Sequence, residues 1–331
     1  MTNLDQSRAQ HRGHSSWRSN LAPLAIAVGL MVAAVGSPTL ARDYALTPNV
    51  PYMSIDGRDV YLDIYAPTNE GPWPVVVAFH GQGARDARTT YDVAIEAAAQ
   101  GMLVFVPTWL DGHSFPITSD VMDMQRQEAS CAVAFAQEQA TGLGGDPDRT
   151  VAYGFSAGLT PAMSAALAPV EGPIPGCATD LSPTSVTAVV AGEGDYFLYT
   201  QIFDEAFRGD PVGMPAHGAA FVDPTAWPTD LDATFFLWTA GDGSEPRTVG
   251  DPTDETDFLA QRDPTGSIRA DLERLGQLDD GVITLVDAGR LMADRLGAAG
   301  LEVTLDEYPG AHTTLDKVPE LIGYLQAATN E

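Results

Sequence analysis

The sequence predicts an α/β fold built on a mostly parallel, twisted sheet of eight strands with helices on both faces. Six apolar, strand-like runs alternate with helical patterns from residue 75 onward. Strands that are separated by helices are joined by crossover connections and therefore lie parallel in one sheet. Ahead of them, Asp56-Gly57-Arg58 gives a tight-turn signal, which predicts an antiparallel hairpin at the edge of the sheet.

The expected elements follow the hairpin in regular order. The strands are expected at residues 75–79, 102–106, 150–153, 186–190, 233–238 and 302–307. The helices are expected at residues 91–100, 122–139, 158–168, 285–297 and 315–328. In the fourth helix, Val286, Leu291, Met292, Arg295 and Leu296 share one helical face. This face is therefore expected to pack on the sheet.

Two segments stand outside this alternation. Residues 192–232 are rich in aromatic side chains and proline. They follow the strand at residues 186–190, at the carboxyl edge of the expected sheet. They are expected to form a small cap at this edge of the sheet, where it would line any pocket that opens there; an ordinary surface excursion with its own small core is the alternative. Residues 243–278 are rich in Asp and in turn formers and are interpreted as an exposed insertion with no assignable role.

Residues 1–41 have the pattern of a secretory signal peptide. Three arginines precede an apolar run from Leu21 to Gly36, and small residues end the segment at Ala41. The apolar run is shorter than a typical membrane-spanning helix. We therefore expect a secreted or periplasmic mature domain at residues 42–331 with no stable membrane span after cleavage; an uncleaved anchor is the alternative.

The chain contains two cysteines, Cys131 and Cys177, and both lie in the expected mature part. An even number of cysteines in an exported protein favours a disulfide bond. The bond would link the helix at residues 122–139 to the loop that follows the helix at residues 158–168. Two buried free thiols are the alternative.

The chain is strongly acidic, with 17 Lys and Arg against 45 Asp and Glu. Without residues 1–41, 14 basic and 44 acidic side chains remain, a formal charge of −30. The negative electrostatic potential around such a chain repels nucleic acid and anionic membranes, so neither is an expected partner. The chain has a single lysine, Lys317, and no phosphate-binding glycine motif, EF-hand loop or Cys/His metal spacing. No metal or other cofactor is therefore expected.

The most informative stretch of the sequence is Gly154-Phe155-Ser156-Ala157-Gly158. It follows an apolar strand and opens a helix of small residues from Leu159 to Leu167. This is the context of a nucleophile elbow, in which a tight strand-to-helix turn exposes a serine hydroxyl. The two glycines give the turn the space that it needs. Ser156 is the predicted nucleophile.

Acyl transfer by a serine requires a base and an acid that orients the base. Only His217 and His312 follow Ser156. His312 comes directly after the last strand, where the base is expected, whereas His217 lies in a Pro/Gly loop with no strand before it. His312 is the predicted base.

Three carboxylates are candidates for the acid. Asp242 is preferred because it comes just after the strand at residues 233–238. Asp280 remains an alternative if the acid loop contains an insertion. Asp195 remains another, because it follows the preceding strand.

The strand at residues 75–79 runs into His80-Gly81-Gln82-Gly83. Glycines there allow the backbone to approach a bound ester and to direct N–H groups toward it. The amides of Gln82, Gly83 and Ala157 are the predicted oxyanion hole. His80 is expected to brace the loop with hydrogen bonds.

Together these motifs resemble the α/β-hydrolase fold, and within it the bacterial esterase and lipase group that carries an H-G-G-G-type oxyanion loop. The resemblance covers residues 58–328 and is carried by residues 60–67, 79–83, 144–149 and 308–312. It implies a carboxylesterase-like activity. Gln82 replaces the glycine that is usual in that loop. Dienelactone hydrolases are similar in outline but carry Cys as the nucleophile.

These features predict a secreted serine esterase that cleaves carboxylic esters through an acyl-enzyme. Its expected partner is a small-molecule or polymer-borne ester. A serine peptidase of the same fold and a non-catalytic binding protein are the alternatives, although a peptidase would usually have a large extra domain that gates peptides.

Overall fold

The computed structural model describes residues 43–55, 57–81, 88–109, 118–183, 185–194, 196, 223–240, 247–248, 266–278, 281–308 and 318–329. The predicted signal peptide therefore lies outside the described residues. So does most of the expected cap, and these two expectations stay predictions.

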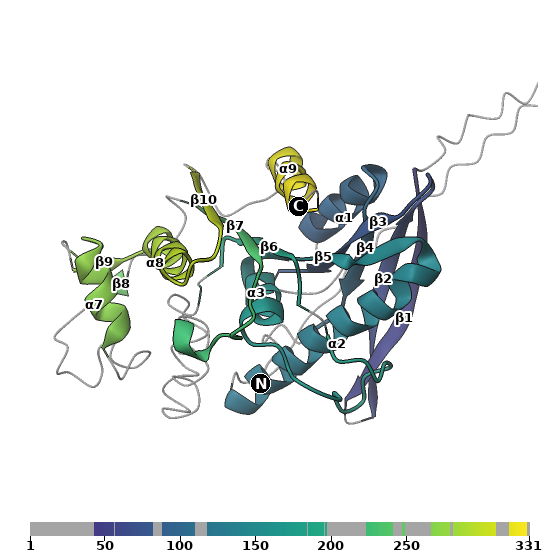
Figure 1. Cartoon of the computed structure of the whole chain (residues 1–331), viewed down its shortest axis with the longest axis horizontal. Coiled ribbons are helices and arrows are strands. Elements are labelled where there is room, and N and C mark those ends of the chain that lie inside the picture. The colour runs from purple at the N-terminus through teal and green to yellow at the C-terminus, as the bar shows by residue number, and fades with distance from the viewer. Residues whose placement is uncertain are drawn as a thin grey trace, which may run out of the picture. The chain divides into compact units, whose positions relative to one another are not determined.

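Eight strands form one sheet in the order β1-β2-β4-β3-β5-β6-β7-β10 (Figure 1). Their bounds are β1 (Tyr44–Ile55), β2 (Arg58–Pro67), β3 (Trp73–Phe79), β4 (Leu103–Pro107), β5 (Gly145–Phe155), β6 (Ala188–Gly192), β7 (Thr234–Ala240) and β10 (Val303–Tyr308). Strand β2 pairs antiparallel with both β1 and β4, and every other pairing in this sheet is parallel. The predicted hairpin and mostly parallel sheet are confirmed.

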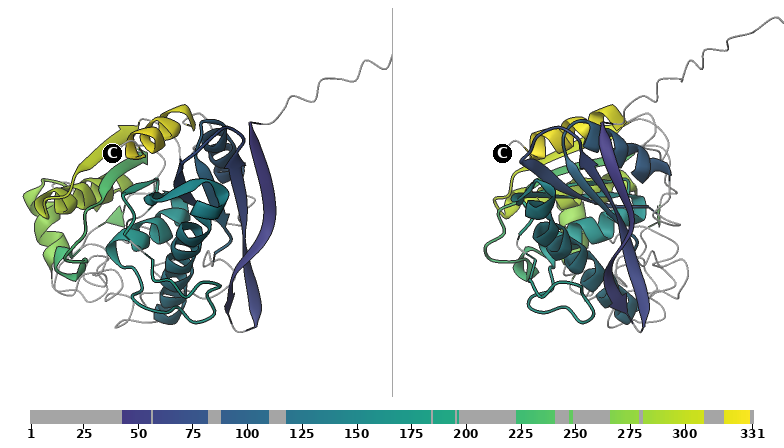
Figure 2. Two further views of the ribbon diagram at one scale, coloured as in Figure 1. Left: turned by 45° about the vertical axis from the view of Figure 1, so that its right-hand side comes forward. Right: turned by 90° about the vertical axis from the view of Figure 1, so that its right-hand side faces the viewer.

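Helices cover both faces of the sheet because alternate side chains of each buried strand point to opposite sides. Val75, Val77 and Phe79 of β3 contribute to one core with α2 (Ser119–Leu143), α3 (Leu159–Leu167) and α8 (Leu285–Ala298). Val76 and Ala78 contribute to the other core with α1 (Arg88–Ala99) and α9 (Val318–Ala328). Figure 2 shows the yellow α9 and the teal α2 on opposite sides of the sheet.

Helix ends differ from the expected bounds where capping residues set them. The Thr118 side chain accepts a hydrogen bond from the Val121 amide, so α2 begins earlier than the apolar pattern indicated. Gly144, with φ 88°, ends this helix in the left-handed conformation. Strand β5 also begins earlier than expected, at Gly145, because Gly145 pairs with Trp73 of β3 ahead of a shift in register.

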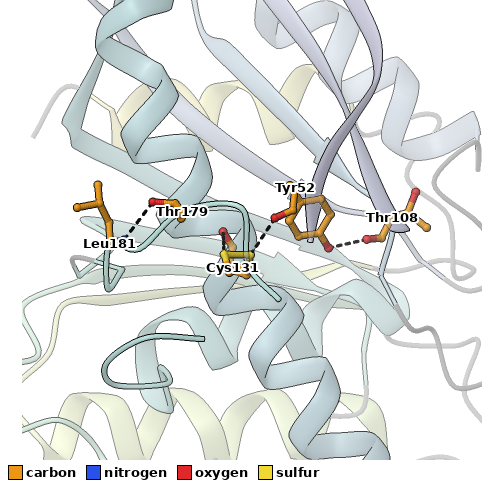
Figure 3. The surroundings of a disulfide bond; sticks show 6 residues. Tyr52, Thr108, Cys131, Thr179 and Leu181 are labelled. Carbon is orange, nitrogen blue, oxygen red and sulfur yellow. Dashed lines mark hydrogen bonds between the residues drawn. A yellow bond between two sulfur atoms is a disulfide. The ribbon is translucent and has the colours of Figure 1, made fainter. Parts of the chain in front are cut away.

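Cys131 and Cys177 form a disulfide, with their Cα atoms 5.7 Å apart, as predicted (Figure 3). The bond joins α2 to the segment that follows α3. The Ser54 amide donates to Gly176 O and the Ala178 amide donates to Tyr52 O, both at 2.8 Å, so the same segment pairs with β1. The disulfide thus closes a loop across the edge of the fold.

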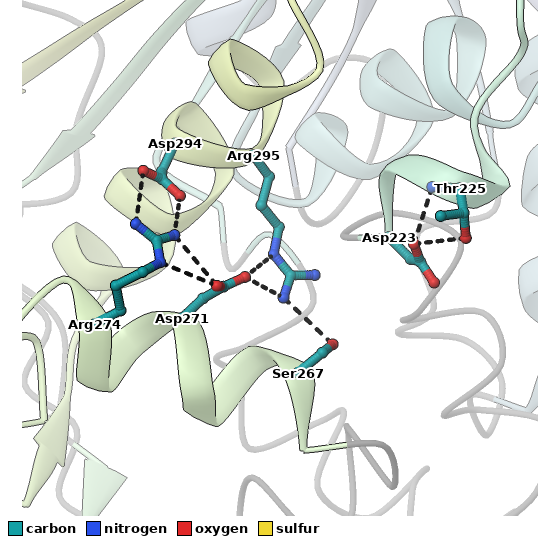
Figure 4. Close-up of polar contacts among 7 residues, drawn as sticks. All are labelled: Asp223, Thr225, Ser267, Asp271, Arg274, Asp294 and Arg295. Carbon is teal, nitrogen blue, oxygen red and sulfur yellow. Dashed lines mark hydrogen bonds and ion pairs between the residues drawn. The ribbon is translucent and has the colours of Figure 1, made fainter.

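The segment between β7 and α8 adds a two-stranded ladder, β8 (Arg247–Thr248) with β9 (Val282–Ile283), and the helix α7 (Ser267–Arg274). Arg295 of α8 is 5% exposed and donates to Asp271 of α7 through Nε at 3.0 Å and Nη2 at 2.8 Å (Figure 4). Arg274 pairs with the same carboxylate. This ionic cluster anchors α7 to α8, and Ile268 and Leu272 of α7 are buried in the same core as α8. The expectation that residues 243–278 form an exposed insertion is therefore wrong for α7, because its apolar face packs against the domain. Among the described helices, none is long and apolar enough to cross a membrane.

Candidate active site

Ser156 occupies the sharp turn between β5 and α3. Strand β5 ends at Phe155, a short 3₁₀ turn covers Ser156–Gly158, and α3 begins at Leu159. Ser156 has φ 57°, a conformation that strains an L-residue and that is held here by the packing around it. The strand, turn and helix predicted around Ser156 are therefore present. The side chain is half-buried.

The two glycines of the motif leave no room for a side chain. A Cβ on Gly154 would lie 2.1 Å from Gly158 O, and a Cβ on Gly158 would lie 2.3 Å from Phe79 O. These distances are far shorter than a van der Waals contact. Only glycine, which has no Cβ, therefore fits at both positions without a shift of the turn or of the end of β3.

The loop after β3 lies against Ser156. A Cβ on Gly81 would be 3.3 Å from Ser156 Cβ, which places the Gly81 backbone in contact range of the serine. His80 is 1% exposed, and its Nδ1–H donates to Gly81 O at 2.6 Å. Trp109 Nε1–H donates to His80 O at 3.1 Å. His80 thus braces its own loop, as its position in the sequence indicated.

The other predicted site residues divide into described and undescribed positions. Ala157 lies in the turn directly after Ser156, as an oxyanion-hole donor requires. Gln82, Gly83, Asp195, Asp242, Asp280 and His312 lie outside the described residues. Strands β7 and β10, which precede Asp242 and His312 in the chain, pair in parallel up to Ala240 and Tyr308. The roles of these residues stay predictions.

The loop after β6 packs between the serine turn and β7. A Cβ on Gly194 would lie 2.7 Å from Ser156 O, and the Glu193 amide donates to Trp238 O at 3.0 Å. Glu193 has φ 53° and is 1% exposed. No sequence pattern predicted a role for this carboxylate. The signal that could have found it is a charged residue between two glycines, directly after an apolar strand.

Three tyrosines have raised pKa values to which the Glu193 carboxylate contributes. Burial first, and then the Glu193 carboxylate, raises the pKa of Tyr153 on β5 and of Tyr196 well above the usual value. Partial burial, followed by Asp306, Glu320 and Glu193, raises the pKa of Tyr308 to about 12. The Tyr153 ring is stacked with Trp238 at a centroid distance of 6.1 Å. Burial is the largest cause in each case, and the Glu193 carboxylate adds to it.

Within the described ranges, no group of three or more His, Cys, Asp or Glu side chains is arranged to hold a metal ion.

The sheet order and the helices on both faces are those of the α/β-hydrolase fold. Among solved structures, the chain is similar to Est2, a thermophilic esterase from Thermogutta terrifontis, with a TM-score of 0.56 and 18% identity over 86% of this chain and 92% of that one. The butyrate-bound form matches with a TM-score of 0.56 and 18% identity over 86% and 94% of the two chains. The form phosphorylated by paraoxon matches with a TM-score of 0.54 and 17% identity over 84% and 91%. Neither a protein-family model nor a curated protein sequence matches the chain.

Proposed function

We propose that this protein is a serine hydrolase that cleaves carboxylic esters through an acyl-enzyme intermediate. The observation that carries the proposal is the strained Ser156 at the strand-to-helix turn, with the Gly81 backbone in contact range of its side chain. A backbone this close to the serine suits a loop that offers amides to a bound ester carbonyl.

In the proposed reaction, Ser156 Oγ attacks the ester carbonyl while His312 takes the hydroxyl proton. Asp242 orients His312. The amides of Gln82, Gly83 and Ala157 stabilise the oxyanion. Collapse of the tetrahedral intermediate breaks the ester C–O bond, and His312 returns the proton to the leaving alcohol. Water, activated by the same base, then hydrolyses the acyl-enzyme to release the acid.

The similar solved structures support this proposal at the level of chemistry. They include esterase forms described with bound butyrate and forms phosphorylated by paraoxon. Organophosphates phosphorylate activated nucleophiles, so the same reactivity is expected of Ser156. The natural substrate is proposed as a small-molecule or polymer-borne ester.

Export is part of the proposal. The predicted signal peptide at residues 1–41 directs the chain out of the cytoplasm, and the Cys131–Cys177 disulfide suits an oxidising compartment. The field of the acidic chain argues against nucleic acid as a partner.

The test combines labelling and turnover on the protein without residues 1–41. A fluorophosphonate probe should label one serine per chain, and peptide mapping should identify Ser156. Ser156→Ala should abolish labelling and the hydrolysis of p-nitrophenyl esters, whereas Ser54→Ala, on the exposed side of β1, should change neither. Absence of labelling would overturn the proposal. Preferential cleavage of aminoacyl-nitroanilides would instead indicate a peptidase.

A further inference from the structure

Trp109 follows β4 and makes two contacts with the loop that lies against Ser156. Its Nε1–H donates to His80 O at 3.1 Å, and its ring lies beside the His80 imidazole with the ring centroids 5.4 Å apart. Both residues are buried, Trp109 at 5% exposed and His80 at 1%. A buried carbonyl is costly to leave without a donor, so the indole N–H restricts where the His80 carbonyl can point.

The same carbonyl lies against the serine turn. A Cβ on Gly158 would be 2.7 Å from His80 O, and a Cβ on Gly81 would be 3.3 Å from Ser156 Cβ. Gly81 O in turn accepts from the His80 Nδ1–H at 2.6 Å. Two consecutive carbonyls at the start of the loop are therefore held. Because a peptide group is planar, a carbonyl that is held also fixes the direction of the amide bonded to it.

The backbone before Trp109 is itself held by two other strands. Thr108 O accepts a hydrogen bond from the Tyr52 hydroxyl of β1 at 2.7 Å (Figure 3), and the Thr108 amide donates to Tyr61 O of β2 at 2.8 Å. Strand β3 pairs in parallel with β4 on one side and with β5 on the other. The indole therefore reaches the loop after β3 from one neighbouring strand, and the serine turn meets the loop from the other.

In acyl transfer, negative charge collects on the carbonyl oxygen only as the tetrahedral intermediate forms. Amide donors accelerate this step when they are already directed at that oxygen, because no reorganisation is then needed. We propose that Trp109 is a positioning residue of the oxyanion loop. Its indole N–H holds the His80 carbonyl against the serine turn, so that the amides of the loop are directed at the oxyanion before it forms. Trp109 acts through His80, and the inference rests on the proposed esterase activity and deepens it.

The test replaces the indole with a ring that has no donor. Trp109→Phe keeps an aromatic ring beside His80 and removes the N–H. Trp73→Phe is the matched control, because Trp73 Nε1–H donates to Asn69 Oδ1 at 2.9 Å at the opposite end of β3. Melting curves confirm that both variants fold, and kcat and KM are measured with a p-nitrophenyl ester.

For Trp109→Phe we expect kcat to fall about tenfold, which is less than the loss of roughly 10²–10³-fold that follows removal of an entire oxyanion donor. The donors remain in this variant and are only less well directed. Acylation and deacylation both pass through an oxyanion, so both steps slow and the KM stays unchanged. Trp73→Phe should retain the kcat of the wild type.

Two inhibitors distinguish positioning from packing. A trifluoromethyl ketone adds to the serine and forms an oxyanion, whereas the corresponding secondary alcohol fills the same pocket without reaction. In Trp109→Phe we expect the inhibition constant of the ketone to rise about tenfold and that of the alcohol to stay unchanged. A residue that only fills space would change the two constants by the same factor.

A folded Trp109→Phe variant with the kcat and the ketone affinity of the wild type would overturn this inference, and so would an equal loss of affinity for ketone and alcohol. Both results leave the proposed function intact. If Trp109→Phe does not fold, benzothienylalanine in place of Trp109 gives the same comparison, since it keeps the bicyclic shape and replaces the N–H by sulfur. A wild-type protein that neither reacts with the fluorophosphonate nor hydrolyses any ester would instead overturn the proposed function itself.

Discussion

The Gly81 backbone lies in contact range of the Ser156 side chain, since a Cβ on Gly81 would be 3.3 Å from Ser156 Cβ and 3.3 Å from Phe155 O. The two residues come from the ends of neighbouring parallel strands, in which Phe79 of β3 is paired with Gly154 of β5. The loop after β3 and the serine turn are therefore fixed to each other by the sheet, and a substrate carbonyl at Ser156 would meet both.

Replacement of Gly154 tests how tightly this turn is built. Gly154→Ala would place a Cβ 2.1 Å from Gly158 O, so we expect it to destabilise the fold by at least about 2 kcal/mol and to suppress fluorophosphonate labelling of Ser156. Urea denaturation and labelling stoichiometry measure the two effects. Gly142→Ala is the matched control, because a Cβ there meets no atom within 4 Å and the residue lies within α2. That variant should be as stable as the wild type or more stable.

The identity of the acid is tested by three separate substitutions. Asp242→Asn should lower kcat by about 10⁴-fold, because a neutral partner no longer holds the base in the required tautomer. Asp280→Asn and Asp195→Asn should leave kcat near that of the wild type. A large loss in either of these variants, together with an active Asp242→Asn variant, would reassign the acid.

The disulfide should stabilise the protein mainly by restricting the unfolded chain. Its two cysteines are separated by 46 positions in the sequence. Replacement of both Cys131 and Cys177 by Ala should lower the free energy of unfolding by about 2–4 kcal/mol. Addition of a reductant should destabilise the wild type by a similar amount and leave the double variant unchanged. Equal stability with and without reductant in the wild type would contradict this prediction.

The buried guanidinium of Arg295 should matter more than the exposed one of Arg274, although both pair with Asp271. Arg295 is 6% exposed at its side chain and Arg274 is 53% exposed. Arg295→Ala removes the buried partner of Asp271 and the packing of its aliphatic stem, so we expect a loss of about 1–3 kcal/mol. Arg274→Ala serves as the control and should have a much smaller effect, since solvent screens its ion pairs. Equal losses in the two variants would contradict the argument from burial.

Stability should fall at alkaline pH because of the buried tyrosines. The pKa values of Tyr153 and Tyr196 are raised in the folded protein, first by burial and then by the Glu193 charge, whereas the unfolded chain releases these protons near pH 10. The stabilisation is therefore fully present below pH 10 and declines above it, by about 1.4 kcal/mol per pH unit for each phenol. Urea unfolding at increasing pH measures the slope. Tyr153→Phe should reduce the slope by the contribution of one phenol. An unchanged slope in this variant would contradict the raised pKa of Tyr153.

The secondary structure was largely predictable from the sequence because its signals are local. Continuous apolar runs predicted every central strand, and the helical spacing of Leu291, Arg295 and Leu296 indicated the buried face of α8, including its arginine. The glycines at positions 154 and 158 also predicted the turn around Ser156, since such a turn requires them. The ladder of β8 with β9 was missed, because strands of two residues carry no periodic signal.

The sequence by itself determined the order of strands and helices, the turn that presents Ser156 and the candidates for base and acid. Tertiary structure alone decided that Glu193 is buried, that Trp109 supports the His80 loop and that Asp271 is the partner of Arg295. The physical reason is that propensity and periodicity act between residues a few positions apart. Burial and charge pairing depend on contacts between distant segments, and among the many carboxylates of an acidic chain these contacts select the few that lie in the interior.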